Sequence, residues 1–104
     1  MIKDNKKDHL LGSFLDSLYI EKGLSQNTVS SYKNDISSFL VWVNKKNIDE
    51  LKATSADLNN YISYLFKNGL KSSSINRKIS SIKHFYLFLL KKKIILHPPV
   101  DEVA

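Results

Sequence analysis

Small polar side chains and single cations recur at helical spacing in two stretches of this sequence, residues 27–38 and 73–84. At about 100° per residue, each set falls on one side of a helix, and neither contains the Glu–Lys pairs of an ordinary solvated surface. Short hydroxyls and amides donate to phosphate oxygens at close range, and Asn pairs with adenine as Arg does with guanine. These patterns predict contacts with a nucleic acid. The residues are Asn27, Ser30, Ser31, Asn34 and Ser38, then Ser73, Asn76, Arg77, Ser80 and His84, with Lys83 at the edge.

No arrangement of residues predicts catalysis. The chain has no Cys, which excludes a thiol nucleophile, a disulfide framework and a cysteine-built zinc site. His9, His84 and His97 lack the spacing of a metal site. No Gly-rich phosphate loop is present, and no spacing places a base beside a nucleophile. We therefore expect no catalytic residue, no metal site and no cofactor.

The charge of the chain is unevenly distributed along its 104 residues. Residues 1–57 contain eight Lys and eight acids, so their net charge is zero. Residues 58–104 contain eight basic residues and only Asp101 and Glu102, which accounts for the whole net charge of +6. A positive surface of this kind favours a polyanion as partner.

No targeting or membrane segment is recognisable. The first eight residues are charged but no apolar run follows them, unlike a signal peptide. No stretch approaches the ~20 apolar residues of a membrane span. We therefore expect a cytoplasmic protein.

The spacing of apolar residues predicts four helices and an all-α fold. Asp8 is the expected N-cap of the first helix and Gly23 its left-handed C-terminal cap. Ser25 opens the second helix, which ends around residues 45–47. The expected inward stripes are Leu10, Leu11, Phe14, Leu15, Leu18 and Tyr19 in the first helix, and Val29, Tyr32, Ile36, Phe39, Leu40 and Val43 in the second.

The third and fourth helices are marked by similar signals. Thr54 or Ser55 caps the third helix, which ends at Asn68 and Gly69. The fourth helix runs from Ser72 to the lysines at 91–93, and the two prolines at 98 and 99 prevent its continuation. The inward stripes are Leu58, Ile62, Leu65 and Phe66, then Ile75, Ile79, Ile82, Phe85, Tyr86 and Leu89. We expect a flexible tail at 1–7, a four-helix domain at 8–96 and the start of a linker at 97–104.

Four residues have an ordinary structural interpretation. Trp42 lies off the main stripe and packs on a neighbouring helix or, alternatively, at an interface. Tyr32 and Asp35 are expected to pack and hydrogen-bond at the edge of the core. His84 is expected to contact solvent or a phosphate.

Two ordered groups of residues resemble the N-terminal core-binding domain of tyrosine recombinases, the Xer-type enzymes and phage integrases. The resemblance covers residues 10–100, and Pro98 stands where that family places an Asn-Pro before a linker. The first group is Leu24, Ser25, Gln26, Asn27, Thr28, Tyr32, Asp35, Ile36 and Phe39. The second is the run from Ser72 to Tyr86, with hydroxyls before Arg77, an Ile-Ser pair, a basic residue and Phe-Tyr.

The resemblance implies a four-helix, SAM-like domain that forms half of a C-shaped clamp around a recombination site. Its second and fourth helices would face the major groove of double-stranded DNA, and its first helix would contact other recombinase subunits. The family cleaves and religates DNA through a phosphotyrosine, without metal or nucleotide, in a separate C-terminal domain. This chain has a single Arg, so that catalytic set cannot be assembled from it. The implied DNA-binding residues are Gln26, Asn27, Thr28, Ser31, Asn34, Ser73, Asn76, Arg77, Ser80, Lys83 and His84.

Other interpretations of the positive face remain open. The domain can instead be a helical module that docks an acidic protein partner, in which case Trp42 and its apolar neighbours dominate binding. Binding to a membrane surface is less consistent with a basic helix that turns hydroxyls outward. The Ser and Asn residues can also reflect biased composition alone.

Overall fold

The computed structural model describes residues 6–98, which fold into four α-helices and one short 3₁₀ turn. No strand occurs within this range, so the predicted all-α fold is confirmed. None of its helices is long and apolar enough to cross a membrane. The elements are α1 (Lys6–Ile20), α2 (Gln26–Lys45), η1 (Glu50–Lys52), α3 (Ser55–Lys67) and α4 (Ser72–Lys91).

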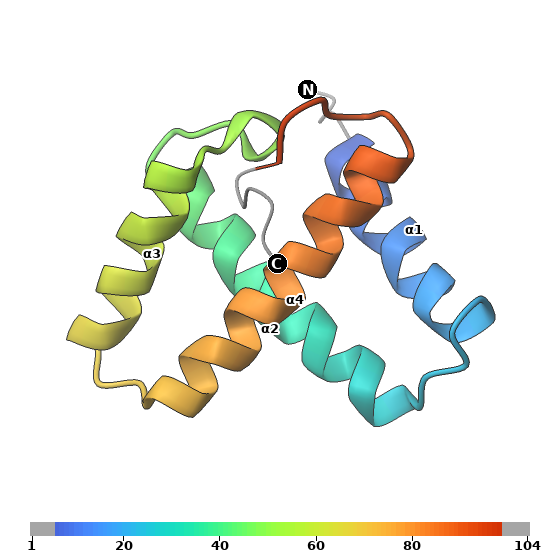
Figure 1. Ribbon diagram of the computed structural model, residues 1–104, viewed down its shortest axis with the longest axis horizontal. Coiled ribbons are helices and arrows are strands. Elements are labelled where there is room, and N and C mark those ends of the chain that lie inside the picture. Colours follow the sequence, from blue (N-terminus) through green and yellow to red (C-terminus); the bar gives the residue numbers. More distant parts are fainter. Residues whose placement is uncertain (1–5, 99–104) are drawn as a thin grey trace, which may run out of the picture.

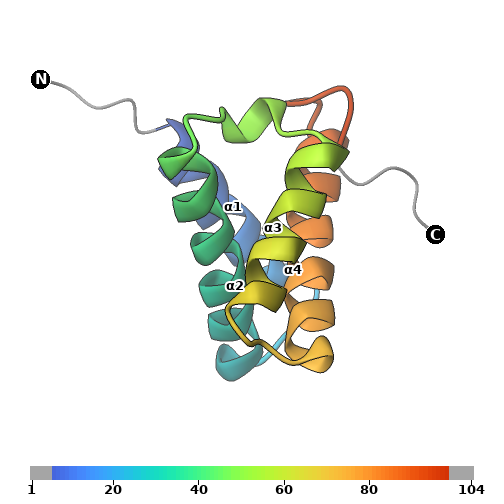
Figure 2. The same cartoon turned by 90° about the vertical axis from the view of Figure 1, so that its left-hand side faces the viewer.

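The two longest helices, α2 and α4, cross at the centre of the molecule, and α1 and α3 flank them on opposite sides (Figure 1). Both α1 and α3 pack against both central helices. The N-terminal ends of α2 and α4 lie at one end of the molecule, whereas η1 and the segment after α4 close the other (Figure 2). This arrangement places the two stretches with polar outward faces on neighbouring helices.

Helix ends follow local capping chemistry. Ser25 accepts a hydrogen bond from the Thr28 backbone N–H at 3.2 Å, and Thr54 forms a reciprocal capping box with Asp57. Gly23 and Gly69 end α1 and α3 at φ +61° and +84°, in the left-handed region that only Gly adopts easily. Ser25, Gly23 and Gly69 were predicted at these helix ends, and Thr54 was one of the two residues expected to cap α3.

The predicted start of the first helix is wrong. Helix α1 begins at Lys6, so Asp8 lies within its first turn rather than at the N-cap. Of the expected flexible tail, residues 1–5 lie outside the described range, and Lys6 and Lys7 are helical. Lys6 and Lys7 are compatible with helical backbone, and a polar residue that can cap a helix, such as Asp8, does not by itself end it.

The core is built from aromatic rings between helices. Trp42 is 8% exposed, and its ring centre lies 5.2 Å from that of Tyr61 on α3, which confirms that it packs on a neighbouring helix. Phe39 contacts Tyr61 edge-on and also meets Tyr86 of α4. Such contacts bury large rings in the low-energy edge-to-face geometry.

Two residues of the expected apolar stripes are exposed. Phe66 is 54% exposed and Tyr19 is 43% exposed, whereas Tyr61, absent from the expected stripe, is 1% exposed. The flanking helices each meet neighbours on one side only, so they bury a narrower strip than their apolar pattern suggests. On α3 this strip is centred on Tyr61 and Leu65, and Phe66 falls at its edge.

The short 3₁₀ turn η1, which closes one end of the molecule, was not predicted from the sequence. Asp49 caps it by accepting the Leu51 N–H at 2.9 Å, and Glu50 is buried. The Tyr86 hydroxyl donates to the Glu50 carbonyl at 2.6 Å, and burial raises the pKa of Tyr86. The connection between α2 and α3 is therefore fixed to α4 rather than free.

Candidate nucleic-acid interface

Nine of the eleven predicted site residues lie in the N-terminal halves of α2 and α4, and the first turns of these two helices lie at one end of the molecule (Figure 2). The other two, Lys83 and His84, lie beyond the middle of α4. Ser25 caps α2, but Lys71 occupies the N-cap position of α4 without a side-chain cap. The first backbone N–H groups of α4 therefore have no side-chain acceptor from the cap residue. Two helix dipoles direct their positive ends to this side, which favours a negatively charged ligand.

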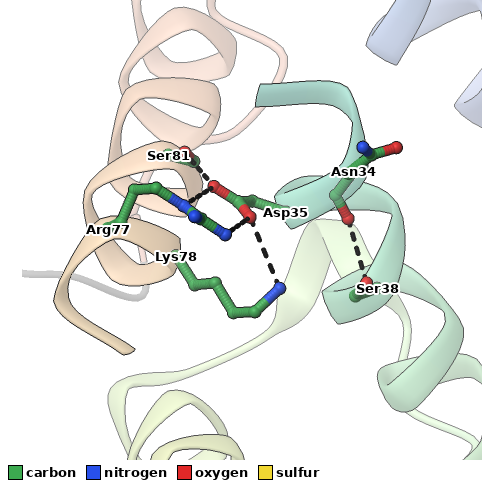
Figure 3. Close-up of polar contacts among 6 residues, drawn as sticks. All are labelled: Asn34, Asp35, Ser38, Arg77, Lys78 and Ser81. Carbon is green, nitrogen blue, oxygen red and sulfur yellow. Dashed lines mark hydrogen bonds and ion pairs between the residues drawn. The ribbon is translucent and has the colours of Figure 1, made fainter. Parts of the chain in front are cut away.

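The predicted residues are accessible. Ten of the eleven are exposed, and Lys83 is half-buried. The predicted residues at 26, 27, 73 and 76 lie toward the N-terminal ends of the two helices. In Figure 3 the Asn34 side chain points away from Arg77.

Four of the predicted residues share one open cleft where α2 and α4 cross. The cleft measures about 280 Å³. Its lining includes five hydroxyls and one guanidinium, and three of the hydroxyls and the guanidinium belong to predicted residues. The lining residues are Thr28, Ser31, Tyr32, Asp35, Arg77, Ser80 and Ser81. The cleft therefore presents hydrogen-bond donors from both helices to one ligand.

Asp35 lies at the base of this cleft, only 1% exposed, and is held by three side chains of α4 (Figure 3). Arg77 donates to it twice, from Nε to Oδ2 at 3.1 Å and from Nη2 to Oδ1 at 2.9 Å. Ser81 Oγ donates to Oδ2 at 2.9 Å, and Lys78 Nζ approaches Oδ1 at 3.4 Å. The expectation that Asp35 hydrogen-bonds at the edge of the core is confirmed.

The protonation state of Asp35 follows from these contacts. Burial by itself raises the pKa of the carboxyl. The hydrogen bonds from Arg77 and Ser81, with the charges of Arg77 and Lys78, outweigh burial and hold the pKa below its ordinary value. Asp35 is therefore ionised at neutral pH, and its charge is compensated within the protein.

His84 is held by Tyr32, a contact that the sequence did not predict. The Tyr32 hydroxyl lies 3.0 Å from His84 Nδ1, which joins α2 to α4 one turn beyond the Asp35 cluster. Burial and the positive charges of Lys22 and Lys83 lower the pKa of His84. At neutral pH its imidazole is therefore mostly uncharged and acts as a hydrogen-bonding group.

Cations lie at both ends of the molecule. Lys22, Lys67 and Lys71 lie in or beside the connections that precede α2 and α4, and Glu21 is next to Lys22 in sequence. Lys45, Lys52 and the lysines at 91–93 lie at the other end, together with the acids at 49, 50 and 57. The end formed by the first turns of α2 and α4 is therefore positive through its lysines and its helix dipoles, and the other end of the molecule carries lysines as well.

Sequence reasoning missed the partners that hold the site together. Ser81 and Lys78 did not belong to the predicted outward face, and Asp35 was not linked to Arg77. One signal was available: Arg77 is the only Arg in the chain, and Asp35 is the only acid within α2. Because an Arg binds a carboxylate through two parallel hydrogen bonds, these two residues were candidates for a bidentate pair.

Within residues 6–98, no group of three His, Asp or Glu side chains is placed to hold a metal ion. The cleft at the crossing contains hydroxyls, a guanidinium and one compensated carboxylate. The described geometry is suited to binding.

Comparison with known proteins identifies relatives over most of the chain. Residues 11–93 match the family described as phage integrase, N-terminal SAM-like domain. The tyrosine recombinase XerD of Rickettsia bellii is 40% identical over 82 residues, covering 79% of this chain and 27% of that protein. The tyrosine recombinase XerC of Staphylococcus aureus is 34% identical over 97 residues, covering 92% of this chain and 33% of that protein. The chain spans about a third or less of the length of these relatives.

Proposed function

Because this chain belongs to the phage integrase family through its N-terminal SAM-like domain, we propose that it is the DNA-binding part of a site-specific tyrosine recombinase. Residues 8–96 form the DNA-binding domain and half of a clamp around the recombination site. Residues 97–104 begin the connection to a catalytic domain, which carries out strand cleavage and religation through a phosphotyrosine. Other recombinase subunits are its partners on DNA.

The observation that carries this proposal is the cleft where α2 and α4 cross. Its hydroxyls and the Arg77 guanidinium come from both helices, and its one carboxylate is already paired. Hydrogen-bond donors from two helices, in a cleft whose one acid is compensated, suit a phosphate backbone and base edges. The proposed contact residues are Gln26, Asn27, Thr28, Ser31, Asn34, Ser73, Asn76, Arg77, Ser80, Lys83 and His84.

The test is a duplex-binding titration of this chain with a library of random-sequence DNA, over a series of salt concentrations. With about five phosphates contacted, log K falls against log salt with a slope of about −4 to −5. No binding, or a slope near zero, refutes the proposal.

Arg77→Ala is the local test of the interface. The variant loses about 1–3 kcal/mol of binding free energy, and the loss depends on sequence if Arg77 contacts a guanine. An equal loss on every duplex assigns Arg77 to a phosphate. The matched control is Lys52→Ala, which removes one charge at the opposite end of the molecule and leaves the affinity nearly unchanged.

A second candidate, a module that docks an acidic protein, is favoured by a groove between α2 and α3. The groove measures about 410 Å³, and its lining includes Trp42, Lys45 and Lys78. Val41 and Tyr64 on its rim are 53% and 46% exposed. Under this candidate, Tyr64→Ser abolishes binding to an acidic peptide library, and duplex DNA does not compete with the peptide.

A further inference from the structure

The guanidinium of Arg77 has one edge bound within the protein and another that is free. Its Nε and Nη2 donate to the two oxygens of Asp35. These contacts use one N–H of each nitrogen, so both N–H groups of Nη1 and the second of Nη2 have no partner in this pair. The Arg77 side chain is 58% exposed, compared with 1% for Asp35. The free edge therefore faces outward from the cleft.

Asp35 cannot follow Arg77 if that side chain moves. Ser81 donates to Oδ2 at 2.9 Å, and Lys78 lies 3.4 Å from Oδ1. Together with the two hydrogen bonds from Arg77, these contacts occupy both oxygens of the Asp35 carboxylate (Figure 3). The contacting side chains come from successive turns of α4. The carboxylate is thus a fixed acceptor against which the Arg77 fork is oriented.

We propose that Asp35 is a positioning residue for DNA binding, which orders the Arg77 guanidinium before DNA arrives and directs its free edge to the duplex. The inference rests on the proposed function. Asp35 does not itself touch DNA and acts through Arg77. Ordering a long side chain at an interface lowers the affinity about 3- to 10-fold. The pair with Asp35 orders the Arg77 side chain during folding, so DNA binding does not have to order it.

The proposal predicts a change in DNA affinity that is opposite in sign to the change expected from simple electrostatics. Asp35→Asn removes one negative charge close to a polyanion, so Coulomb attraction alone strengthens DNA binding. Loss of positioning weakens it, because Asn cannot hold the guanidinium fork with two charged oxygens. We expect Asp35→Asn to bind DNA about 3- to 10-fold more weakly than the unmodified chain.

The experiment is a double-mutant cycle with the unmodified chain, Asp35→Asn, Arg77→Ala and the double variant, all titrated with the same random-sequence duplex library at one salt concentration. Circular dichroism and Trp42 fluorescence give the folded fraction, and affinities refer to folded protein. Asp16→Asn is the matched control, since Asp16 is an exposed acid on α1. This control binds as tightly as the unmodified chain or slightly more tightly.

The cycle separates positioning from a structural role. If Asp35 acts through Arg77, Asp35→Asn weakens binding in the unmodified background and causes no further loss in the Arg77→Ala background. If the folded Asp35→Asn variant binds DNA as well as the unmodified chain or better, the inference is overturned while the proposed function stands. If the unmodified chain itself does not bind duplex DNA, the proposed function fails instead.

Arg77→Lys provides a test that does not depend on the folding of the Asp35 variant. Lys keeps the positive charge but, as a single ammonium group, cannot hold Asp35 along one edge and present a second planar edge to DNA. We expect this variant to lose at least about 3-fold in affinity. Affinity equal to that of the unmodified chain overturns the inference, because charge alone would then account for the contribution of Arg77.

Discussion

Replacing Arg77 by Ala is expected to destabilise the folded chain more than replacing Asp35 by Asn, although both substitutions break the same ion pair. The physical reason is the difference in exposure: 58% for the Arg77 side chain and 1% for that of Asp35. Without Asp35, the guanidinium remains hydrated. Without Arg77, a buried carboxylate keeps only Ser81 at 2.9 Å and Lys78 at 3.4 Å.

The magnitudes follow from the cost of leaving a buried charge without its partner. Removing one partner of a fully buried pair costs about 3–5 kcal/mol. Because two donors to Asp35 remain, we expect about 2–3 kcal/mol of lost unfolding free energy for Arg77→Ala. Asp35→Asn keeps one acceptor oxygen and leaves the exposed Arg77 in water, but it also removes the counter-charge of Lys78, whose side chain is 15% exposed. About 1–2 kcal/mol is therefore expected for this variant.

The assay is equilibrium urea unfolding followed by fluorescence. Trp42 is the only Trp of the chain and is 8% exposed, so its emission reports the loss of the core. Lys33→Ala, at an exposed cation on α2, is the control and shifts stability by less than about 0.5 kcal/mol. A larger loss for Asp35→Asn than for Arg77→Ala refutes the reasoning, because the cost would then not follow the burial of the group left behind.

Three further predictions use independent contacts. The pKa of Asp35 is below its ordinary value of 3.8, so the ionised carboxylate contributes fully to the stability of the fold above that pH, and this contribution is lost as the pH falls through the lowered folded-state pKa. The difference in unfolding free energy between the unmodified chain and Asp35→Asn should therefore shrink as the pH falls through that pKa. A difference that stays constant to the lowest pH contradicts this. Tyr86→Phe leaves the Glu50 carbonyl without its 2.6 Å donor and should lower the unfolding free energy by about 1–3 kcal/mol in urea; an unchanged midpoint means that another donor replaces the hydroxyl. In Gly69→Ala the added Cβ meets no atom within 4 Å, but the Ala must adopt φ +84°. Thermal unfolding should therefore show a loss of about 1 kcal/mol of unfolding free energy from backbone strain alone. A rise in the thermal midpoint would contradict this, because the turn would then relax without strain.

Local chemistry explains why most helix boundaries were predictable. Ser25, Thr54, Gly23 and Gly69 act on backbone groups within a few residues, so their effect does not depend on the rest of the fold. The start of α1 was missed because a residue that can cap a helix competes with continuation of the helix. The 3₁₀ turn η1 was missed because its place is fixed by Tyr86, 36 residues away in sequence.

Burial was less predictable on the flanking helices than on the central ones. An apolar stripe shows which side of a helix turns inward, but its buried width depends on how many neighbours that side meets. The central helix α2 meets α1, α3 and α4, and its stripe residues Ile36, Phe39 and Val43 are fully buried. On α3, with fewer neighbours, Phe66 remains exposed.

The amino-acid sequence by itself determined the helical fold class, the caps that end most helices, the acid-free stretch from residue 58 to residue 100 and the polar outward faces of α2 and α4. These properties follow from the spacing of residues along one helix and from counts of charge. Only the tertiary structure decided which polar residues meet. The crossing of α2 and α4 brings Asp35 and Arg77 together across 42 positions and leaves one guanidinium edge free. That pairing depends on the angle and register between two packed helices, which no periodicity within either helix specifies.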